Sequence, residues 1–146
     1  MNIWSEFASK FNKINVYTLV KKSLTGLENE IIRLNQEQLY SSGQLSDGSF
    51  LDSYSPYTIV KKQEARSGHD SRVANMTLRD TGAFYKSFKV KITNENVLVY
   101  ATDGKTDKLI TDFGKNIFGL TEQNWEELIE QNVVPSIIRN INDILN

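Results

Sequence analysis

The sequence predicts an α+β protein with a long N-terminal helix, a small antiparallel sheet built from a β-hairpin, a short helix, a C-terminal helix and a long extended loop or arm. Three patterns support this fold class. Apolar residues recur every three or four positions between Tyr17 and Leu34, alternate with polar residues over residues 88–93, and recur at helical spacing after Thr121.

The bulk composition is that of one globular domain spanning residues 1–146. Hydrophobic residues make up 39% of the chain and charged residues 24%, and the formal net charge is −1, so the whole chain has no strong attraction to nucleic acid or to anionic membrane. The chain has no cysteine, which excludes disulfides, thiolate catalysis and cysteine-based metal sites. Neither a signal-peptide pattern nor a membrane-spanning run is present, so we expect the protein to stay in the cytoplasm where it is made.

Charge is distributed unevenly along the chain. Residues 56–79 hold five basic and two acidic residues, a net charge of +3, whereas residues 121–146 hold one basic and five acidic residues, a net charge of −4. One interpretation is two solvated faces. The other is complementarity between different faces of neighbouring copies, which suits a ring.

The longest helical pattern lies near the N-terminus. Asn15 or Thr18 can cap this helix, and the Ser41–Gly43 segment ends it. Gly26 falls inside the pattern and should cost ~1 kcal/mol relative to alanine. The side chains that we expect on the buried face are Tyr17, Val20, Leu24, Leu27, Ile31 and Leu34.

Residues 41–77 show no clear period. A structureless loop of this length is uncommon in a compact domain, so the segment is either a functional arm or a region that orders against a partner. Its mixture of aromatic and basic residues gives only a weak signal for contact with DNA. The residues that we expect to contact a neighbouring subunit are Tyr54, Tyr57, Lys61, Lys62, Arg66 and Arg72.

Residues 78–121 predict the second half of the fold. Asp80 or Thr81 is a suitable N-cap for a short helical turn over residues 82–87. A strand with a basic exposed face follows over residues 88–93, and after a turn at residues 94–96 a more apolar, central strand follows over residues 97–101. Residues 106–113 form about two helical turns that end at Gly114.

The C-terminal segment predicts a capped helix. Thr121 is the expected N-cap, and the acidic residues after it suit the positive end of the helix dipole. Pro135 should end or kink this helix near Val134. The expected buried side chains are Trp125, Leu128, Ile129 and Val133.

The residues Asp80, Thr81, Gly82 and Ala83 also imitate the catalytic turn of a retropepsin-like aspartic protease. Such an enzyme needs a second aspartate, so this chain would act as a homodimer. The context disagrees: Arg79 precedes the aspartate, and no glycine-rich flap follows. A cap and turn is therefore the favoured interpretation of these residues. His69 is the only histidine, and the chain lacks phosphate-binding and calcium-loop motifs, so we expect no catalytic residue, no metal and no cofactor.

The order of these motifs resembles the tail-completion (virion morphogenesis) proteins of tailed bacteriophages. The resemblance covers residues 78 to about 140. It rests on collinear segments rather than on a single motif, namely Leu78-Arg79-Asp80-Thr81-Gly82, Ser87 before the FKVKI strand, the VLVYAT strand, Asp112-Phe113-Gly114, Phe118-Gly119-Leu120-Thr121 and the NWEELIEQ helix.

The resemblance implies a structural virion protein and not an enzyme. Such a protein is made in the host bacterial cytoplasm and forms a sixfold or twelvefold homo-oligomeric ring at the head–tail neck. The ring surrounds the DNA channel and contacts portal, adaptor or tail proteins, with at most weak contact to DNA and none to membrane. A generic protein-interaction module with the same fold is a second alternative beside the protease. The residues then expected to define the fold of the core at 78–146 are Asp80, Thr81, Gly82, Phe113, Gly114, Phe118 and Gly119.

Overall fold

The computed structural model describes residues 3–12, 14–64, 67–93 and 95–146, and it has the predicted α+β composition. Its helices are α1 (Ile3–Phe11), α2 (Val16–Thr25), α3 (Glu28–Ser42), α4 (Pro56–Gln63), α5 (Ala83–Lys86), α6 (Thr106–Phe113), α7 (Glu122–Leu128) and α8 (Val134–Leu145). A 3-10 turn, η1 (Lys115–Ile117), and a π-helical turn, η2 (Ile129–Val133), complete the helical elements. The strands β1 (Phe88–Ile92) and β2 (Val97–Ala101) pair as one antiparallel hairpin.

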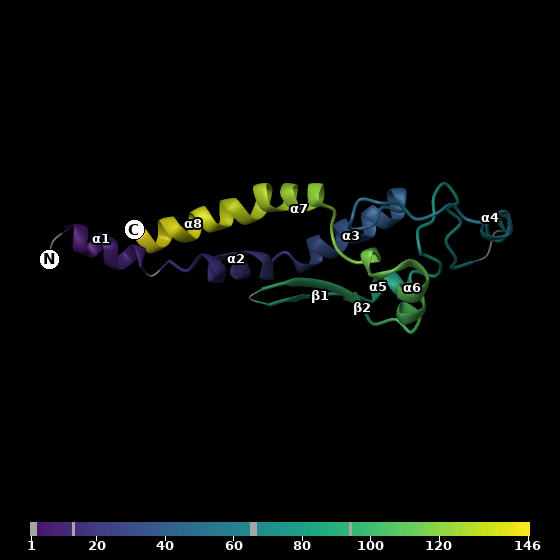
Figure 1. The fold of residues 1–146 in the computed structure, drawn as a ribbon, viewed down its shortest axis with the longest axis horizontal. Coiled ribbons are helices and arrows are strands. Elements are labelled where there is room, and N and C mark those ends of the chain that lie inside the picture. The colour runs from purple at the N-terminus through teal and green to yellow at the C-terminus, as the bar shows by residue number, and fades with distance from the viewer. Residues whose placement is uncertain (1–2, 13, 65–66, 94) are drawn as a thin grey trace.

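The molecule is elongated (Figure 1). Helices α1 and α2 run beside α8 and form a stalk at one end, where both chain termini lie. Helices α4, α5 and α6 gather at the other end, and β1 packs against α3 between the two ends. Among the described residues, no helix combines the length and the apolar character that crossing a bilayer requires.

The long N-terminal helix is divided into α2 and α3, which corrects the prediction of one continuous helix. Gly26 and Leu27 separate them, with Leu27 at φ −111° and ψ 9°, outside the usual helical region. The break rotates the buried face, so Tyr17 is 80% exposed whereas Ile31 is fully buried. The predicted cap is confirmed, because the Asn15 side chain accepts a hydrogen bond from the Thr18 N–H at 3.2 Å.

The core lies between α3, the hairpin and the segment after α6. Its centre is a group of aromatic rings in edge-to-face and tilted contact, with Phe88 5.0 Å from Phe84 and 5.3 Å from Phe118 between ring centroids. Aliphatic side chains that are at least nine-tenths buried surround the rings, namely Ile31, Leu39, Leu45, Val99, Ile117, Leu120 and Leu128.

Two buried amides on α3 hold the chain that links α6 to α7. Asn35 is fully buried; its Nδ2 donates to the Ile117 carbonyl at 3.1 Å and its Oδ1 accepts from the Gly119 N–H at 2.8 Å. Gln38 donates to the Gly119 carbonyl at 3.1 Å and accepts from the Thr121 N–H at 2.9 Å. These four bonds, called the amide clamp below, satisfy backbone groups that burial would otherwise leave unpaired.

The hairpin has the predicted strands. Lys89 and Lys91 are exposed on one face of β1, and Phe88 on the opposite face is 3% exposed. Cross-strand partners share a face, and Val99 opposite Val90 is 4% exposed. The prediction that β2 is a central strand is wrong for the described residues, because their sheet has two strands and β2 lies at its edge.

The short helix α5 begins differently from the prediction. Neither Asp80 nor Thr81 is its N-cap, because Gly82 occupies that position with φ 90°. This left-handed conformation is open to glycine without the steric cost that a Cβ atom brings. Thr81 makes only a 3.4 Å contact from its Oγ1 to the Ala83 N–H.

The C-terminal helices form one path through a π-helical turn. Thr121 caps α7 as predicted, accepting from the Asn124 N–H at 3.2 Å. The turn η2 ends two residues before Pro135, which is in the first turn of α8. Because proline has no N–H to donate and its ring clashes with the carbonyl four residues earlier, a local widening of the helix accommodates it. The predicted burial of Leu128 and Val133 is confirmed, but Ile129 is 42% exposed.

The amide clamp gives a first prediction. Asn35→Ala should lower the free energy of unfolding by about 3 kcal/mol, because it leaves a buried N–H and a buried carbonyl without partners. Asn29→Ala, the same substitution at an exposed position of α3, should change it by less than about 0.5 kcal/mol. Urea denaturation measures both values, and equal effects of the two variants would contradict the role given to the clamp.

Candidate functional site

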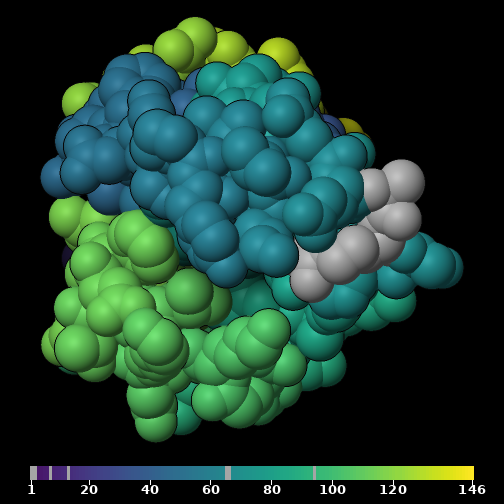
Figure 2. All heavy atoms as spheres, turned by 90° about the vertical axis from the view of Figure 1, so that its right-hand side faces the viewer, coloured from purple at the N-terminus to yellow at the C-terminus, as the bar shows by residue number. Residues whose placement is uncertain are grey.

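A hollow with a mainly apolar lining lies at the end of the molecule away from the stalk. It has a volume of about 450 Å³ and opens between the arm, the turn at residues 78–84 and α6. Figure 2 views this end, with the arm above and α6 below. Its apolar wall consists of Tyr54, Tyr57, Met76, Leu78, Phe84, Leu109 and Phe113. The size and the aromatic lining are those of a ligand or peptide pocket.

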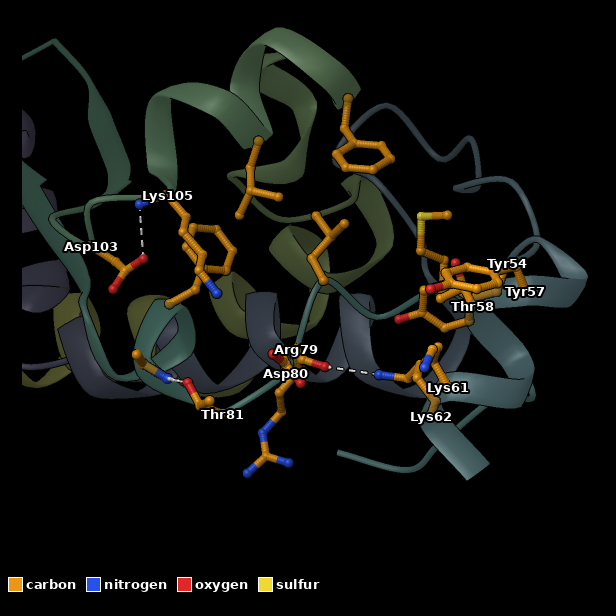
Figure 3. A pocket seen from close by; sticks show the side chains of 17 residues that line it. Tyr54, Tyr57, Thr58, Lys61, Lys62, Arg79, Asp80, Thr81, Asp103 and Lys105 are labelled. Carbon is orange, nitrogen blue, oxygen red and sulfur yellow. Dashed lines mark hydrogen bonds between the residues drawn. The ribbon is translucent and has the colours of Figure 1, made fainter. Parts of the chain in front are cut away.

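Helix α4 positions one side of the pocket. It begins at the Ser55-Pro56 pair, where the Ser55 hydroxyl accepts from the Thr58 N–H at 3.2 Å, and proline is favoured in the first helical turn. One turn of helix therefore brings Tyr57 and Lys61 to the same side, with the Lys61 Nζ 5.7 Å from the Tyr57 ring centroid. Both side chains appear at the pocket in Figure 3.

Basic groups flank the pocket on two sides. Lys62 is only 9% exposed, and its Nζ donates to the Arg79 carbonyl at 3.2 Å while lying 5.0 Å from the Tyr54 ring centroid. Lys105 lies across the pocket from Lys61 and Lys62 in Figure 3. The lining has four basic residues, Lys61, Lys62, Arg79 and Lys105, and two acidic ones, Asp80 and Asp103. The Arg79 guanidinium is paired with Asp70, so three lysines remain beside two aspartates and the charges of the lining nearly balance.

A hydrogen bond and an ion pair fasten the arm to the turn that precedes α5. The His69 Nδ1 lies 2.7 Å from the Asp80 Oδ1, and an Arg79 guanidinium nitrogen lies 2.7 Å from the Asp70 Oδ2. The Asp70 N–H also donates to the Asp80 carbonyl at 2.7 Å. We call these contacts the ion-pair clasp. The clasp joins residues 69–70 to residues 79–80 and so fixes the position of the predicted Asp-Thr-Gly motif.

The Asp70 carboxylate is held ionised. Burial acts to raise its pKa, but hydrogen bonds from the Arg72 N–H and the Arg79 guanidinium outweigh burial, so the pKa is lowered from its ordinary value. The same hydrogen bond acts on the other partner in the opposite direction: it raises the pKa of the Arg79 guanidinium. Only 2% of the Asp70 side chain is exposed, against 39% of the Arg79 side chain.

The structure brings together many of the residues that the sequence singled out. Tyr54, Tyr57, Lys61 and Lys62 line the same pocket as Asp80, Thr81, Gly82 and Phe113. Arg72 is not among the lining residues; it donates to the Asn75 side chain and to the Ser41 carbonyl. Arg66 lies outside the described residues.

The remaining motif residues lie elsewhere. Phe118 packs in the aromatic core, and Gly119 is held by the amide clamp. Gly119 has φ 103°, and a Cβ atom there would lie 3.3 Å from the Ser46 Cβ, so both conformation and space favour glycine. Gly114 ends α6 with φ 85°.

Some parts of the pocket were not predicted. Helix α4 interrupts the arm, which is hydrogen-bonded to the rest of the molecule at several points, including the Ser46 N–H to the Asn116 carbonyl and the Tyr54 hydroxyl to Thr77. The Ser-Pro signal at residues 55–56 could have located α4. The pocket also includes Asp103, Lys105 and Leu109. No pattern in the sequence around these three residues indicates that they lie beside the arm.

The surroundings of Asp80 bear on the protease alternative. A protease dyad needs two facing carboxylates that share a proton. In this structure the Asp80 carboxylate is paired with His69 and the Asp70 carboxylate with Arg79. No group of three or more potential metal ligands occurs among the residues that the structure describes.

In comparisons with protein families, curated proteins and solved structures, no family model, protein or structure matches the chain.

The ion-pair clasp gives a second prediction. Asp70→Asn should lower the free energy of unfolding at pH 7 by about 2 kcal/mol, since it removes a buried, charge-assisted pair. Because the folded pKa of Asp70 is lowered, its stabilisation is complete above the unfolded value of about 4 and is lost as pH falls through the folded value. The difference between wild type and variant should therefore shrink below about pH 4.

The matched control is Asp112→Asn, which breaks the exposed pair of Lys108 and Asp112. It should cost less than about 1 kcal/mol at pH 7. Denaturant titrations at several pH values measure both variants, and a constant effect of Asp70→Asn from pH 7 to pH 2 would contradict the assignment.

Proposed function

We propose that this chain is a structural subunit of a ring at the head–tail neck of a tailed bacteriophage, where the ring surrounds the DNA channel and joins head to tail. The sequence resemblance over residues 78 to about 140 suggests this class. The shape and the surface of the molecule support assembly.

The observation that carries the proposal is the size of the accessible surface. The chain exposes 9614 Å², whereas a compact monomer of the same mass exposes about 7,600 Å². The excess of about 2,000 Å² is comparable to two standard interfaces of about 800 Å² per partner. A ring subunit uses two such faces, one toward each neighbour.

The exposed surface includes large apolar side chains along the stalk. Those on α1, α2 and α8 with more than half of their surface exposed are Ile3, Trp4, Phe11, Val16, Tyr17 and Ile138. Helix α8 contributes no buried residue although its sequence is strongly amphipathic. An apolar surface of this kind is typical of a protein–protein interface.

Charge differs between two segments of the chain. The described basic residues of the first segment, Lys61, Lys62, Arg72 and Arg79, lie on α4 and in the stretch before α5, whereas the acidic residues Glu122, Glu126, Glu127 and Glu130 lie on α7 and η2 in the middle of the molecule. Opposite charges on different parts of one chain favour contact between unlike faces of two copies. Such a heterologous contact forms a ring when its rotation closes.

The oligomeric mass tests the proposal. Native mass spectrometry of the purified chain, alone and mixed with phage portal or adaptor protein, should give a species of six or twelve copies in at least one sample. A monomer in both samples would reject the ring and favour the generic interaction module. A tight dimer in both would favour the protease.

A charge reversal tests which faces meet. Lys61→Glu should raise the protein concentration that ring assembly requires about tenfold at low salt, because it replaces a positive charge at the pocket end by a negative one. Lys86→Glu makes the same change at an exposed residue outside the pocket and should have little effect. Analytical ultracentrifugation at two salt concentrations compares them; equal weakening would exclude the pocket from the interface.

Asp80→Asn separates the proposal from the protease alternative. The asparagine amide can either donate a hydrogen bond to the His69 Nδ1 or accept one from it, so the ring should form as in the wild type. Cleavage of a peptide substrate by the wild type, lost in this variant, would instead identify the chain as the protease.

A further inference from the structure

The outer edge of β2 has unpaired backbone groups. The Thr93 N–H donates to the Asn96 carbonyl and the Thr102 N–H donates to the Ser87 carbonyl. Hydrogen-bonded pairs alternate in an antiparallel ladder, so within the register of the hairpin the backbone groups of Leu98 and Tyr100 point toward β1. Those of Val97, Val99 and Ala101 point away from β1. In the part of the chain that the structure describes, no hydrogen bond reaches these outward groups.

A groove of about 440 Å³ follows this edge. All five residues of β2 line it, and its other residues come from α6 and from the segment at 115–119. A five-residue strand is about 17 Å long. A hollow in contact with every residue of an edge strand has the form that an extended peptide occupies when it adds a strand to a sheet.

A buried hydroxyl in the groove also lacks a partner. Thr106 is 8% exposed and lines the groove at the start of α6. Its Oγ1 is the one buried side-chain polar atom among the described residues without a hydrogen bond. Buried hydroxyls are nearly always paired, and a backbone N–H or carbonyl of an added strand can supply the missing bond.

The edge also lacks the usual protection against pairing. Edge strands are commonly blocked by lysine, proline or a bulge. The sequence of β2, VLVYA, has no charge and no proline, and the register with β1 is continuous. The lysines of the hairpin, Lys89 and Lys91, are on β1 and so do not block the outer edge of β2.

We propose that the β2 edge binds an extended strand of a different protein. The added strand has apolar side chains on the core face of the sheet and acidic side chains on the opposite face, where Lys89 and Lys91 of β1 lie beyond β2, two strand spacings or about 10 Å away. This site does not depend on the ring. Charge complementarity selects the occupant, because neither β1 nor β2 carries an acidic residue and a second copy adding either strand would bring no negative charge to the lysine face. In the lining of the groove itself, the positive charge of Lys115 and the negative charge of Asp107 cancel.

The test uses the full chain and a synthetic heptapeptide, acetyl-Glu-Val-Glu-Val-Glu-Val-Glu-amide. Amide hydrogen exchange is followed by NMR at increasing peptide concentration. At saturation, exchange of the Val97, Val99 and Ala101 amides should slow by about tenfold or more, whereas Leu98 and Tyr100, which already face β1, should not change. Absent protection, or protection of all five amides, would overturn the proposal.

Two control peptides examine the mode of binding. In the added strand the valines point their N–H groups toward β2, because paired residues share a face. Methylation of the valine nitrogens should therefore abolish the protection. Replacement of the glutamates by lysine should weaken binding about tenfold at low salt. Equal binding of the lysine peptide would remove the basis for an acidic partner.

Thr106→Val tests the unpaired hydroxyl. Valine has nearly the same shape, so the variant should unfold at a higher temperature than the wild type and bind the peptide about fivefold more weakly. Thr111→Val, on the exposed part of the same helix, should leave peptide binding unchanged. Equal binding by Thr106→Val would exclude that contact. Protection of the outward amides that depends on protein concentration, without peptide, would mean that a second copy covers the edge and would overturn the proposal.

Discussion

The amide clamp fixes the chain between α6 and α7 against α3, at the centre of the molecule. Asn35 and Gln38 lie one helical turn apart on α3, and together they bind both backbone groups of Gly119 and the flanking groups of Ile117 and Thr121. A shift of this segment by one residue would leave several buried polar groups without partners, so the clamp selects a single register. The clamp therefore sets where α6 and α7 lie relative to α3.

The ion-pair clasp plays the corresponding part at the other end. It connects the arm to the turn that precedes α5, and the pocket lies between the arm, this turn and α6. The Asp-Thr-Gly letters thus have a structural explanation: Asp80 pairs with His69, and Gly82 supplies the positive φ with which α5 begins.

The chain buries a small core and leaves much of its surface exposed. The core lies where α3 meets the hairpin, whereas α8 has no buried residue and α1 and α2 carry several exposed apolar side chains beside the buried Leu19. Exposed apolar surface on a stalk and unpaired backbone on a sheet edge are both costly in an isolated protein. Both features are consistent with a chain that functions in contact with other proteins.

Local patterns were enough to predict most of the elements. The hairpin, α6 with its Gly114 end, and the caps at Asn15 and Thr121 follow from alternation, helical period and side chains that bond to nearby backbone, all of which act within a few residues. Gly26 was likewise a local signal for the break between α2 and α3. Packing was needed to place the Asn35 amide against Gly119 and to bring Lys105 and Leu109 into the same pocket as Tyr57. These contacts join residues that lie far apart in the chain, and their energy comes from burial and from paired polar groups that no local pattern records.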